Sequence, residues 1–285
     1  MLDDRTYLVT GATRGIGRAT AEALARRGGR VILACRDLTA GEDVEETLRR
    51  ATGNPELYVA QLDLSSLDAV RAATADVLDR FDRLDVLINN AGAFTHERQQ
   101  NADGLELQFA VNHLGHFLLT HGLRNLLVAS APARVVTVSS SAYLRGKLRL
   151  DVVEAGGAAP YNPYQAYADS KLANVLFAFE LARRLAGTGV TSNALHPGTV
   201  DTQMLAEYLK APPTGMPSQY LSTDEGAATT VHVATATELV SVTGQYFERA
   251  AAARVARHAT DADAARQLWA WSCRMTGAQD SDWAT

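Results

Sequence analysis

Three tyrosines and one lysine lie within residues 161–171, in the stretch YNPYQAYADSK. A lysine ammonium group close to a tyrosine favours the phenolate and lowers a phenol pKa that is ordinarily about 10, which makes the tyrosine a usable acid and base. Tyr167 and Lys171 are four residues apart and would share one face of a helix. Tyr164 is seven residues from the lysine, and Tyr161 lies further upstream. We therefore expect Tyr167 to do the proton chemistry and the other two tyrosines to be packing or pocket-wall aromatics.

The helix that carries this pair is predicted to begin at residue 163. Pro163 suits the first helical position, where its missing N–H costs nothing. Asn162 suits the N-cap, and Gln165 stands where a capping box places its reciprocal partner. This start puts Tyr167 in the second helical turn.

A glycine-rich turn near the start of the sequence is a candidate phosphate site. The stretch VTGATRGIGRATAEAL runs from a predicted strand into a predicted helix and contains Gly11, Gly15 and Gly17. Glycine lets the backbone approach a pyrophosphate, and the helix N-terminus offers free N–H groups and the positive end of a dipole. The alternative is a tight strand-to-helix connection without a ligand. Because dinucleotide folds place their phosphate turn after the first strand, we favour a dinucleotide site.

The end of the second predicted strand bears on which nicotinamide cofactor is bound. An acid there bonds the ribose 2′-hydroxyl of NAD, whereas an arginine accepts the 2′-phosphate of NADP. Arg36 comes first and Asp37 directly after it, while Arg14 in the glycine turn could supply a second guanidinium group. Asp37 has an alternative role as the cap of the following helix. We therefore expect NADP(H) rather than NAD(H).

Two further strand ends carry polar residues that could face the same cofactor. Asp63 either accepts a hydrogen bond from the adenine amino group or caps the helix that begins near Ser66. Asn90 and Gly92 either lie against the cofactor, or the amides of Asn89 and Asn90 satisfy neighbouring backbone. The sequence leaves both alternatives open.

These residues must be positioned by alternating strands and helices. The predicted strands are TYLVT, RVILAC, LYVAQLD, LDVLINN, ARVVTVSS, VTSNALH and GQYF. Between them lie segments with apolar spacing near 3.6, the longest covering residues 103–127. Strands that are apolar nearly throughout and are separated by helices indicate an α/β fold with a doubly wound, Rossmann-type parallel sheet of about seven strands and helices on both faces. Ligands of such sheets bind beyond the carboxyl ends of the strands.

Two long stretches without clear periodicity, residues 142–161 and 199–223, follow strands and would overhang this edge. Loops of this length are usually functional lids or disordered. The second stretch combines methionine, leucine and tyrosine side chains with breaker residues at 212–217. Residues 199–223 are therefore predicted to form a mobile lid over an apolar substrate, with an ordered surface excursion as the alternative.

The composition indicates one soluble domain covering residues 1–285, because no linker, charge run or repeat divides the sequence. A net charge of −5 with both signs interspersed gives no basic surface for nucleic acid or anionic membrane. Two cysteines are too few for a disulfide framework, and the opening MLDDRTYLVTG contains no signal or membrane anchor, so we expect a cytoplasmic protein. The spacing of His113, His116 and His121 suggests no metal triad, so we expect packing or hydrogen-bonded histidines and no metal site.

In their order along the chain, these motifs resemble those of the short-chain dehydrogenase/reductase family. The motifs are Thr10-Gly11 with Gly15-Ile16-Gly17, Asn89-Asn90-Ala91-Gly92, a serine cluster after the fifth strand, Tyr167-x-x-x-Lys171 and Pro197-Gly198. Phrases such as LACRD, YADSKLANVLF and NALHPGTVDT resemble more narrowly the retinol dehydrogenase-like branch. The resemblance covers nearly the whole chain and implies an NADP(H)-dependent oxidoreductase of apolar carbonyls and alcohols. Vertebrate members of this branch often carry a membrane-anchoring N-terminus, which we do not expect here.

The resemblance also implies roles for individual residues. Ser140 would polarise the substrate oxygen, with Ser139 as the alternative because a one-residue slip reverses which side chain faces the site. Asn112 would hold a water that relays protons to Lys171, which would also hold the nicotinamide ribose. The residues expected to contact the cofactor are Gly11, Thr13, Arg14, Gly15, Ile16, Gly17, Arg36, Asp63, Leu64, Asn90, Ala91, Gly92, Tyr167, Lys171, Pro197, Gly198 and Val200.

Two other classes of protein remain alternatives. A catalytically silent NADP-binding regulator would keep the fold, although intact Ser140, Tyr167 and Lys171 argue against it. An epimerase or dehydratase would retain its cofactor without net consumption of NADPH. Many family members pair the helices around residues 103–127 and 162–185 between subunits, so a homo-oligomer is compatible with the sequence.

Overall fold

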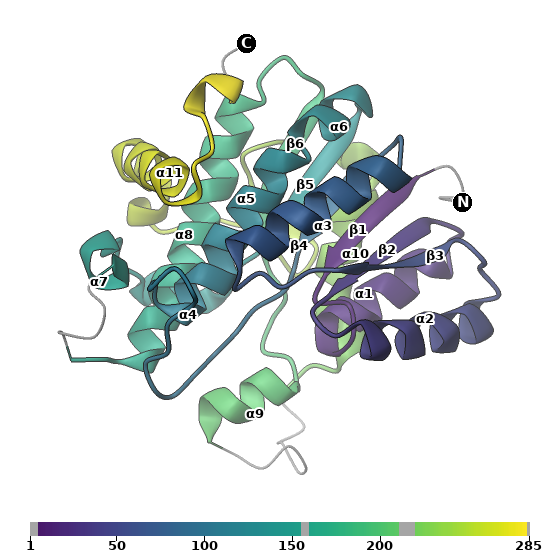
Figure 1. The fold of residues 1–285 in the computed structure, drawn as a ribbon, viewed down its shortest axis with the longest axis horizontal. Helices are drawn as coiled ribbons and strands as arrows, with labels where there is room; N and C mark the ends of the chain where they lie inside the picture. Colours follow the sequence, from purple (N-terminus) through teal and green to yellow (C-terminus); the bar gives the residue numbers. More distant parts are fainter. Residues whose placement is uncertain (1–4, 155–159, 211–219, 284–285) are drawn as a thin grey trace.

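The computed structural model describes residues 5–154, 160–210 and 220–283. One sheet has the strand order β3-β2-β1-β4-β5-β6-β7-β8, of which Figure 1 labels β1 to β6. The strands are β1 (Thr6–Thr10), β2 (Arg30–Cys35), β3 (Leu57–Gln61), β4 (Val86–Asn89), β5 (Ala133–Val138), β6 (Val190–His196), β7 (Tyr246–Glu248) and β8 (Ala251–Ala252). Strands β1 to β7 pair in parallel, and β8 pairs antiparallel to β7. The two-residue β8 is too short to show a sequence pattern, so only the seven parallel strands were predicted.

Helices cover both faces of this sheet, which confirms the Rossmann-type α/β prediction. On one face lie α1 (Gly15–Ala25), α2 (Leu38–Thr52) and α10 (Thr223–Thr235). On the other lie α3 (Leu67–Arg80), α5 (Gly115–Gly122), α8 (Pro163–Arg184) and α11 (Ala262–Thr276). Shorter helices are α4 (Leu107–Phe109), α6 (Arg124–Ala129), α7 (Leu150–Glu154) and α9 (Gln203–Leu209), and 3₁₀ turns occur at Ser141–Arg145, Thr237–Leu239, Arg257–Thr260 and Asp280–Trp283.

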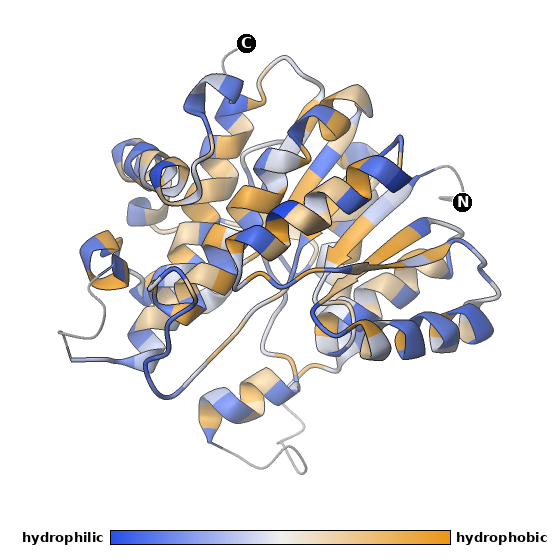
Figure 2. Ribbon diagram, in the orientation of Figure 1, coloured by the Kyte–Doolittle hydropathy of each residue, from blue (hydrophilic) through white to orange (hydrophobic). Residues whose placement is uncertain are grey.

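The strands form because their side chains are apolar on both faces. Every residue of β1, β4 and β5 is buried, as expected for parallel strands between two layers of helices. Figure 2 shows hydrophobic residues concentrated on the sheet and along much of α8, and hydrophilic residues along α2, which borders solvent. Burying each large aliphatic side chain contributes about 1.5–3 kcal/mol to folding. The sheet is thus a rigid base for the residues at its carboxyl edge.

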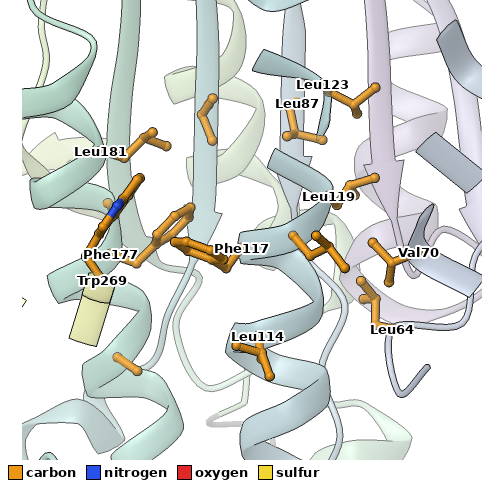
Figure 3. Close-up of a cluster of buried hydrophobic side chains, with 14 of the residues drawn as sticks. Leu64, Val70, Leu87, Leu114, Phe117, Leu119, Leu123, Phe177, Leu181 and Trp269 are labelled. Atoms are coloured by element: carbon orange, nitrogen blue, oxygen red, sulfur yellow. The ribbon is translucent and has the colours of Figure 1, made fainter. Parts of the chain in front are cut away.

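The C-terminal helix α11 was missing from the sequence-based prediction. Its Trp269 stacks on Phe177 of α8, with ring centroids 6.1 Å apart and an interplanar angle of 16° (Figure 3). The same indole meets Phe117 of α5 edge to face at 5.0 Å. Trp271 is also buried. These aromatic contacts fix α8, which carries the predicted catalytic pair, from its outer side.

The helical run predicted over residues 103–127 is interrupted rather than continuous. It consists of α4, a π-helical segment at Ala110–Leu114, α5 and α6. The Glu106 carboxylate caps the run by accepting hydrogen bonds from two backbone N–H groups, so the first helical residue is 107. A π-helical turn inserts an extra residue and often marks a functional site. This one carries Asn112.

The two long aperiodic stretches contain short helices that the sequence pattern did not show. The first includes α7 and the second includes α9, whereas residues 155–159 and 211–219 lie outside the described residues. The predicted breakers of the lid therefore also lie outside them. Figure 1 shows α9 apart from both helical layers. Its Gln203 accepts a hydrogen bond from Arg14 in the glycine turn between β1 and α1, so α9 overhangs the carboxyl edge of the sheet.

Candidate active site

Helix α8 positions the predicted catalytic pair. It begins at Pro163, and the Asn162 side chain accepts a hydrogen bond from the Gln165 N–H at 3.0 Å, as predicted. The capping-box part of the prediction is wrong. The Gln165 side chain donates instead to the Arg145 carbonyl oxygen and to the Asp169 carboxylate. These bonds tie the first turns of α8 to the 3₁₀ turn after β5.

Tyr167 and Lys171 lie together, as their helical spacing predicted. The Lys171 Nζ atom is 5.5 Å from the centroid of the Tyr167 ring and donates to the Val138 carbonyl oxygen at 3.3 Å. Ser140 lies close enough to Tyr167 to lower the pKa of its phenol. The structure thus brings Ser140, Tyr167 and Lys171 together at the junction of β5 and α8.

The pKa of Tyr167 differs from the sequence-based expectation. Burial raises the pKa of Tyr167 to about 12; the interaction with Ser140 opposes this rise, and Tyr208 adds to it. Burial also lowers the pKa of Lys171 to about 8. The prediction that the phenol pKa is lowered is wrong, because desolvation by burial dominates the shift. Near neutral pH the Tyr167 phenol therefore keeps its proton and is available as a donor.

The structure distinguishes the two candidate serines. Ser139 is buried, and its hydroxyl donates to the Lys171 carbonyl oxygen at 2.7 Å. The Ser140 hydroxyl accepts from the Ala142 N–H at 3.2 Å, and Ser140 also influences the pKa of Tyr167. Ser139 thus holds the α8 backbone, and Ser140 is the serine beside the phenol.

Asn112 clamps the loop after β4 beside the catalytic pair. Its Oδ1 accepts from the Ala93 N–H at 2.6 Å, and its Nδ2 donates to the Ala93 carbonyl oxygen at 3.1 Å and to the Ser170 hydroxyl at 2.9 Å. A Cβ atom added at Gly92 would lie 3.4 Å from Asn112 Oδ1 and 3.6 Å from Lys171 Nζ. Both distances are ordinary van der Waals contacts, so Gly92 lies against these two groups.

The other two tyrosines have different surroundings. The Tyr161 hydroxyl donates to the buried Glu106 carboxylate at 2.9 Å and accepts from Gln108 at 2.6 Å. Tyr164 is 40% exposed and packs edge to face on Tyr208, with ring centroids 4.9 Å apart. Tyr161 therefore belongs to a hydrogen-bonded packing cluster, and Tyr164 belongs to an aromatic surface.

The glycine turn between β1 and α1 fits a bound pyrophosphate. Gly11 and Gly15 have φ of +67° and +56°, a region that favours glycine. A Cβ atom at Gly17 would lie 2.2 Å from the Gly11 carbonyl oxygen and 2.5 Å from Asn90 Nδ2. Helix α1 has no side-chain cap and no acid in its first turn, whereas side chains cap α2, α3, α8 and α10. Its first N–H groups are thus left for an anion.

Arg36 and Asp37 have separate roles in the structure. The Asp37 carboxylate accepts from the Ala40 N–H at 3.1 Å and caps α2, which confirms the alternative role predicted for it. Arg36 is exposed, and no side chain of the described residues pairs with its guanidinium group. Arg14 is exposed too, but it donates to Gln203 Oε1 at 2.6 Å. Of the two arginines, Arg36 therefore has the guanidinium group that is not engaged by another described side chain.

Asp63 and Asn90 are engaged by neighbouring groups. The Asp63 Oδ1 atom accepts from the Ser65 N–H at 2.9 Å and the Ser65 hydroxyl at 2.6 Å. Ser66 caps α3, so the alternative in which Asp63 is the cap is wrong. The Asn90 Nδ2 atom donates to the Thr10 carbonyl oxygen at 2.8 Å, so this amide does satisfy neighbouring backbone. Contact of either residue with a cofactor stays a prediction.

The remaining predicted cofactor residues follow the carboxyl ends of strands. They are Thr13 and Ile16 after β1, Leu64 after β3, Ala91 after β4, and Pro197, Gly198 and Val200 after β6. Gly198 has φ of +91°, and a Cβ atom there would lie 2.5 Å from Leu221. The predicted residues thus share one edge of the sheet.

Sequence reasoning missed Phe94 as part of the site. Its ring centroid lies 5.0 Å from Tyr208, 5.5 Å from Tyr164 and 5.9 Å from Tyr167. We call these four residues the aromatic wall. The Met204 Sδ atom of α9 lies 4.0 Å from the Tyr167 hydroxyl oxygen, in front of this wall. The signal for Phe94 was its place in a loop at the ligand edge, directly after the Asn-Asn-Ala-Gly-Ala stretch.

Metal and membrane sites have no support in the described residues. No three His, Cys, Asp or Glu side chains of that part of the chain are grouped so that they could hold a metal ion. No helix in the described ranges is sufficiently long and apolar to cross a bilayer. Cys35 and Cys273 are buried and free.

This arrangement agrees with a similarity to known proteins. A family model described as short chain dehydrogenase matches residues 5–212. The chain belongs to the short chain dehydrogenase family. It is therefore an oxidoreductase that acts on CH–OH or C=O groups, and members of this family use nicotinamide cofactors.

Individual relatives of this short chain dehydrogenase extend the similarity along the chain. Human retinol dehydrogenase 14 is 42% identical over 297 residues, which cover 97% of this chain and 88% of the relative. This similarity supports the retinol dehydrogenase-like branch. A crystal structure of a protein from Mycobacterium Paratuberculosis has a TM-score of 0.78 and 35% identity, and the match covers 98% of this chain and 95% of the other. A structure described as a short chain dehydrogenase from Escherichia coli complexed with NADPH has a TM-score of 0.71 and 27% identity, covering 87% and 97%.

Proposed function

We propose that this short chain dehydrogenase uses NADP(H) to interconvert a ketone or aldehyde with the corresponding alcohol on an apolar small molecule. The observation that carries the proposal is the cluster of Ser140, Tyr167 and Lys171 at the carboxyl edge of the sheet. Reduction is the favoured direction with NADPH as the cofactor.

Each side chain has its own task in this proposal. The bound cofactor supplies the hydride for the carbonyl carbon. Ser140 donates a hydrogen bond that orients the substrate oxygen, and Tyr167 delivers its proton to the same oxygen. Lys171 binds the ribose and holds a positive charge beside the phenol. Asn112 keeps the loop after β4 in place through both backbone groups of Ala93.

The preference for an apolar substrate is supported by the aromatic wall. The Met204 thioether occupies the space in front of the Tyr167 hydroxyl, where a substrate oxygen has to lie. A substrate that displaces it meets the rings of Phe94, Tyr164 and Tyr208, which favour apolar and planar groups. Helix α9 is then the described part of a lid over the substrate.

The lid predicts a change in hydrogen exchange over Gln203–Leu209. A helix of seven residues is too short to be stable alone, so its amides should exchange quickly without ligand. Adding NADPH with a product alcohol should slow their exchange by about tenfold or more, because the apolar side of α9 then packs on the ligand. Amides of α11, on the outer side of α8, serve as the control. Unchanged protection of α9 in the ternary complex would contradict the lid.

The preference for NADP is supported by the arrangement after β2. Asp37 is used as a cap, and Arg36 is exposed without a partner among the described side chains. A guanidinium group pairs with phosphate through charge-assisted hydrogen bonds. The NADPH bound to the Escherichia coli relative is consistent with this preference.

Replacing Arg36 by alanine should weaken NADPH binding by roughly tenfold to a hundredfold, because one charge-assisted hydrogen bond contributes about 1.5–3 kcal/mol. NADH lacks the 2′-phosphate, so its dissociation constant should change little and is the internal control. The two constants are measured by fluorescence titration of the wild type and the variant. Equal losses for both cofactors, or a wild-type preference for NADH, would show that the assignment is wrong.

An assay of NADPH oxidation over apolar ketones, aldehydes and quinones tests the proposed activity. Carbonyl-dependent oxidation supports it, and binding of NADPH without turnover of any of these compounds would favour the silent regulator. A cytoplasmic location is part of the same proposal, supported by the free thiols of Cys35 and Cys273. A single catalytic domain and a homo-oligomer are compatible with it.

A further inference from the structure

His116 connects two loops of the proposed active site from inside the protein. It is 1% exposed and lies on α5, directly after the π-helical segment. Its Nδ1 atom is 3.1 Å from the Asn112 carbonyl oxygen, and its Nε2 atom is 2.8 Å from the Thr10 hydroxyl oxygen. The imidazole thus spans from the turn that carries Asn112 to the end of β1, where the glycine turn begins.

These contacts determine the tautomer of His116. A backbone carbonyl oxygen can only accept a hydrogen bond, so the proton must be on Nδ1. Burial lowers the pKa of His116 to about 4, with an opposing contribution from the Asn112 carbonyl and a further lowering by Lys171. The ring is therefore neutral at pH 7, and Nε2 is an acceptor. It follows that the Thr10 hydroxyl donates its proton to Nε2.

The Thr10 hydroxyl in turn holds the loop after β4. It accepts hydrogen bonds from the backbone N–H groups of Asn90 and Ala91, both at 2.9 Å. Its proton has two acceptors in reach, His116 Nε2 at 2.8 Å and the Ile88 carbonyl oxygen at 3.3 Å, and the shorter contact is the better hydrogen bond. With Nε2 as the acceptor, both oxygen lone pairs of Thr10 point toward the two N–H groups.

The loop after β4 is consequently fixed at both ends through one connected set of hydrogen bonds. Thr10 holds Asn90 and Ala91, while the Asn112 side chain holds Ala93. His116 links Thr10 and Asn112, so the relative position of these two residues depends on it. Gly92, between the two attachment points, lies beside Lys171 Nζ.

We propose that His116, in its Nδ1–H tautomer, is a positioning residue for this enzyme. The imidazole fixes Asn112 relative to Thr10. It thereby holds the loop of Asn90 and Gly92 beside Lys171, in the geometry that binds the cofactor. This inference rests on the proposed function, since it concerns the same site. His116 itself touches neither the substrate nor the reacting atoms.

The tautomer is tested by ¹⁵N NMR of the histidine side chains, with the His116 signals assigned by their loss in His116→Gln. At pH 7 the His116 spectrum should show a protonated Nδ1 and an unprotonated Nε2. It should not titrate between about pH 8 and pH 5. A protonated Nε2 with bare Nδ1, or a titration near the ordinary histidine value, would overturn the inference whatever the enzyme's substrate.

The positioning role is tested by a matched set of variants. His116→Leu removes both hydrogen bonds at similar size, whereas His116→Gln keeps one donor and one acceptor. The leucine variant should lose roughly tenfold to a hundredfold in kcat and bind NADPH several-fold more weakly, with a smaller change in KM for the carbonyl substrate. The glutamine variant should recover part of both losses. A purely structural role would not give this rescue or this split between kcat and KM.

His113→Leu is the control for loss of a buried histidine. His113 is equally buried in the adjoining π-helical segment, but its Nε2 atom pairs with the Ser272 hydroxyl of α11 at 2.9 Å, away from the cofactor loop. This variant should lower the unfolding temperature and leave kcat and NADPH binding within about threefold of wild type. If folded His116→Leu has the same kcat and NADPH affinity as wild type, the positioning role of His116 is wrong and the proposed function is unaffected. If the wild-type protein itself does not bind NADPH, the proposed function is wrong.

Discussion

Replacing Tyr167 by phenylalanine is expected to lower kcat by about 10²–10⁴-fold, the usual contribution of a general acid. The ring and its packing on Phe94 and Tyr208 remain, while the hydroxyl beside Ser140 is lost. NADPH binding should stay within about threefold of wild type, because the variant loses a proton donor and keeps Lys171. Steady-state assays with one carbonyl substrate and a fluorescence titration of NADPH measure the two quantities.

Tyr164→Phe is the matched control for this variant. Tyr164 lies one helical turn earlier on the same helix, is 40% exposed and contributes only its ring to the aromatic wall. It should keep most of the wild-type turnover. Near-wild-type kcat in Tyr167→Phe together with a collapse in Tyr164→Phe would mean that the wrong tyrosine has been identified as the acid.

Replacing Lys171 by methionine is expected to damage both turnover and cofactor binding, which distinguishes it from Tyr167→Phe. The ammonium group is proposed to bind the ribose and to place a charge beside the phenol, so kcat/KM should fall by about 10²–10⁴-fold and NADPH should bind at least about tenfold more weakly. The same titration and assay measure both. NADPH affinity equal to that of wild type would contradict the ribose-binding role.

The stability of Lys171→Met checks that this loss is not caused by unfolding. Burial lowers the pKa of Lys171 from 10.5 to about 8, so holding the charged form inside the fold at neutral pH costs about 3 kcal/mol. Methionine removes that cost, and the unfolding temperature should be equal to or above that of wild type. Between pH 8 and 10.5, Lys171 of the wild type is protonated to a greater extent in the unfolded chain than in the folded protein. The contribution of Lys171 to the free energy of unfolding therefore rises with pH in this range. This rise should be absent in the variant.

Local sequence patterns predicted those parts of the site that depend on neighbours along the chain. The parallel strands follow from apolar runs between helices, the start of α8 from Asn162 and Pro163, and the contact of Tyr167 with Lys171 from a four-residue spacing. The role of Asp37 as a cap was one of two predicted alternatives, and its hydrogen bond to the next helix confirms this role.

Features that depend on distant residues could not be predicted in this way. The raised pKa of Tyr167 comes from burial by other segments, among them α9, and no spacing rule measures burial. Phe94 faces Tyr167 only because β4 and α8 meet at one edge of the sheet. His116 reaches Thr10 across 106 positions of the sequence. The helix α11 is a different case, because its apolar spacing is a local feature of the sequence.

Transfer of deuterium from NADPH tests the central claim most directly. Wild-type enzyme is incubated with NADPH that carries deuterium at nicotinamide C4 and with an apolar ketone or aldehyde that supports turnover, and the product is analysed by mass spectrometry. The proposed function predicts an alcohol with one deuterium on the former carbonyl carbon and one NADP⁺ for each alcohol formed. It also predicts the same label from Tyr167→Phe at the lower rate, because the hydride and the proton come from different groups. A product without deuterium and without net NADPH consumption would contradict the account and favour an epimerase or dehydratase.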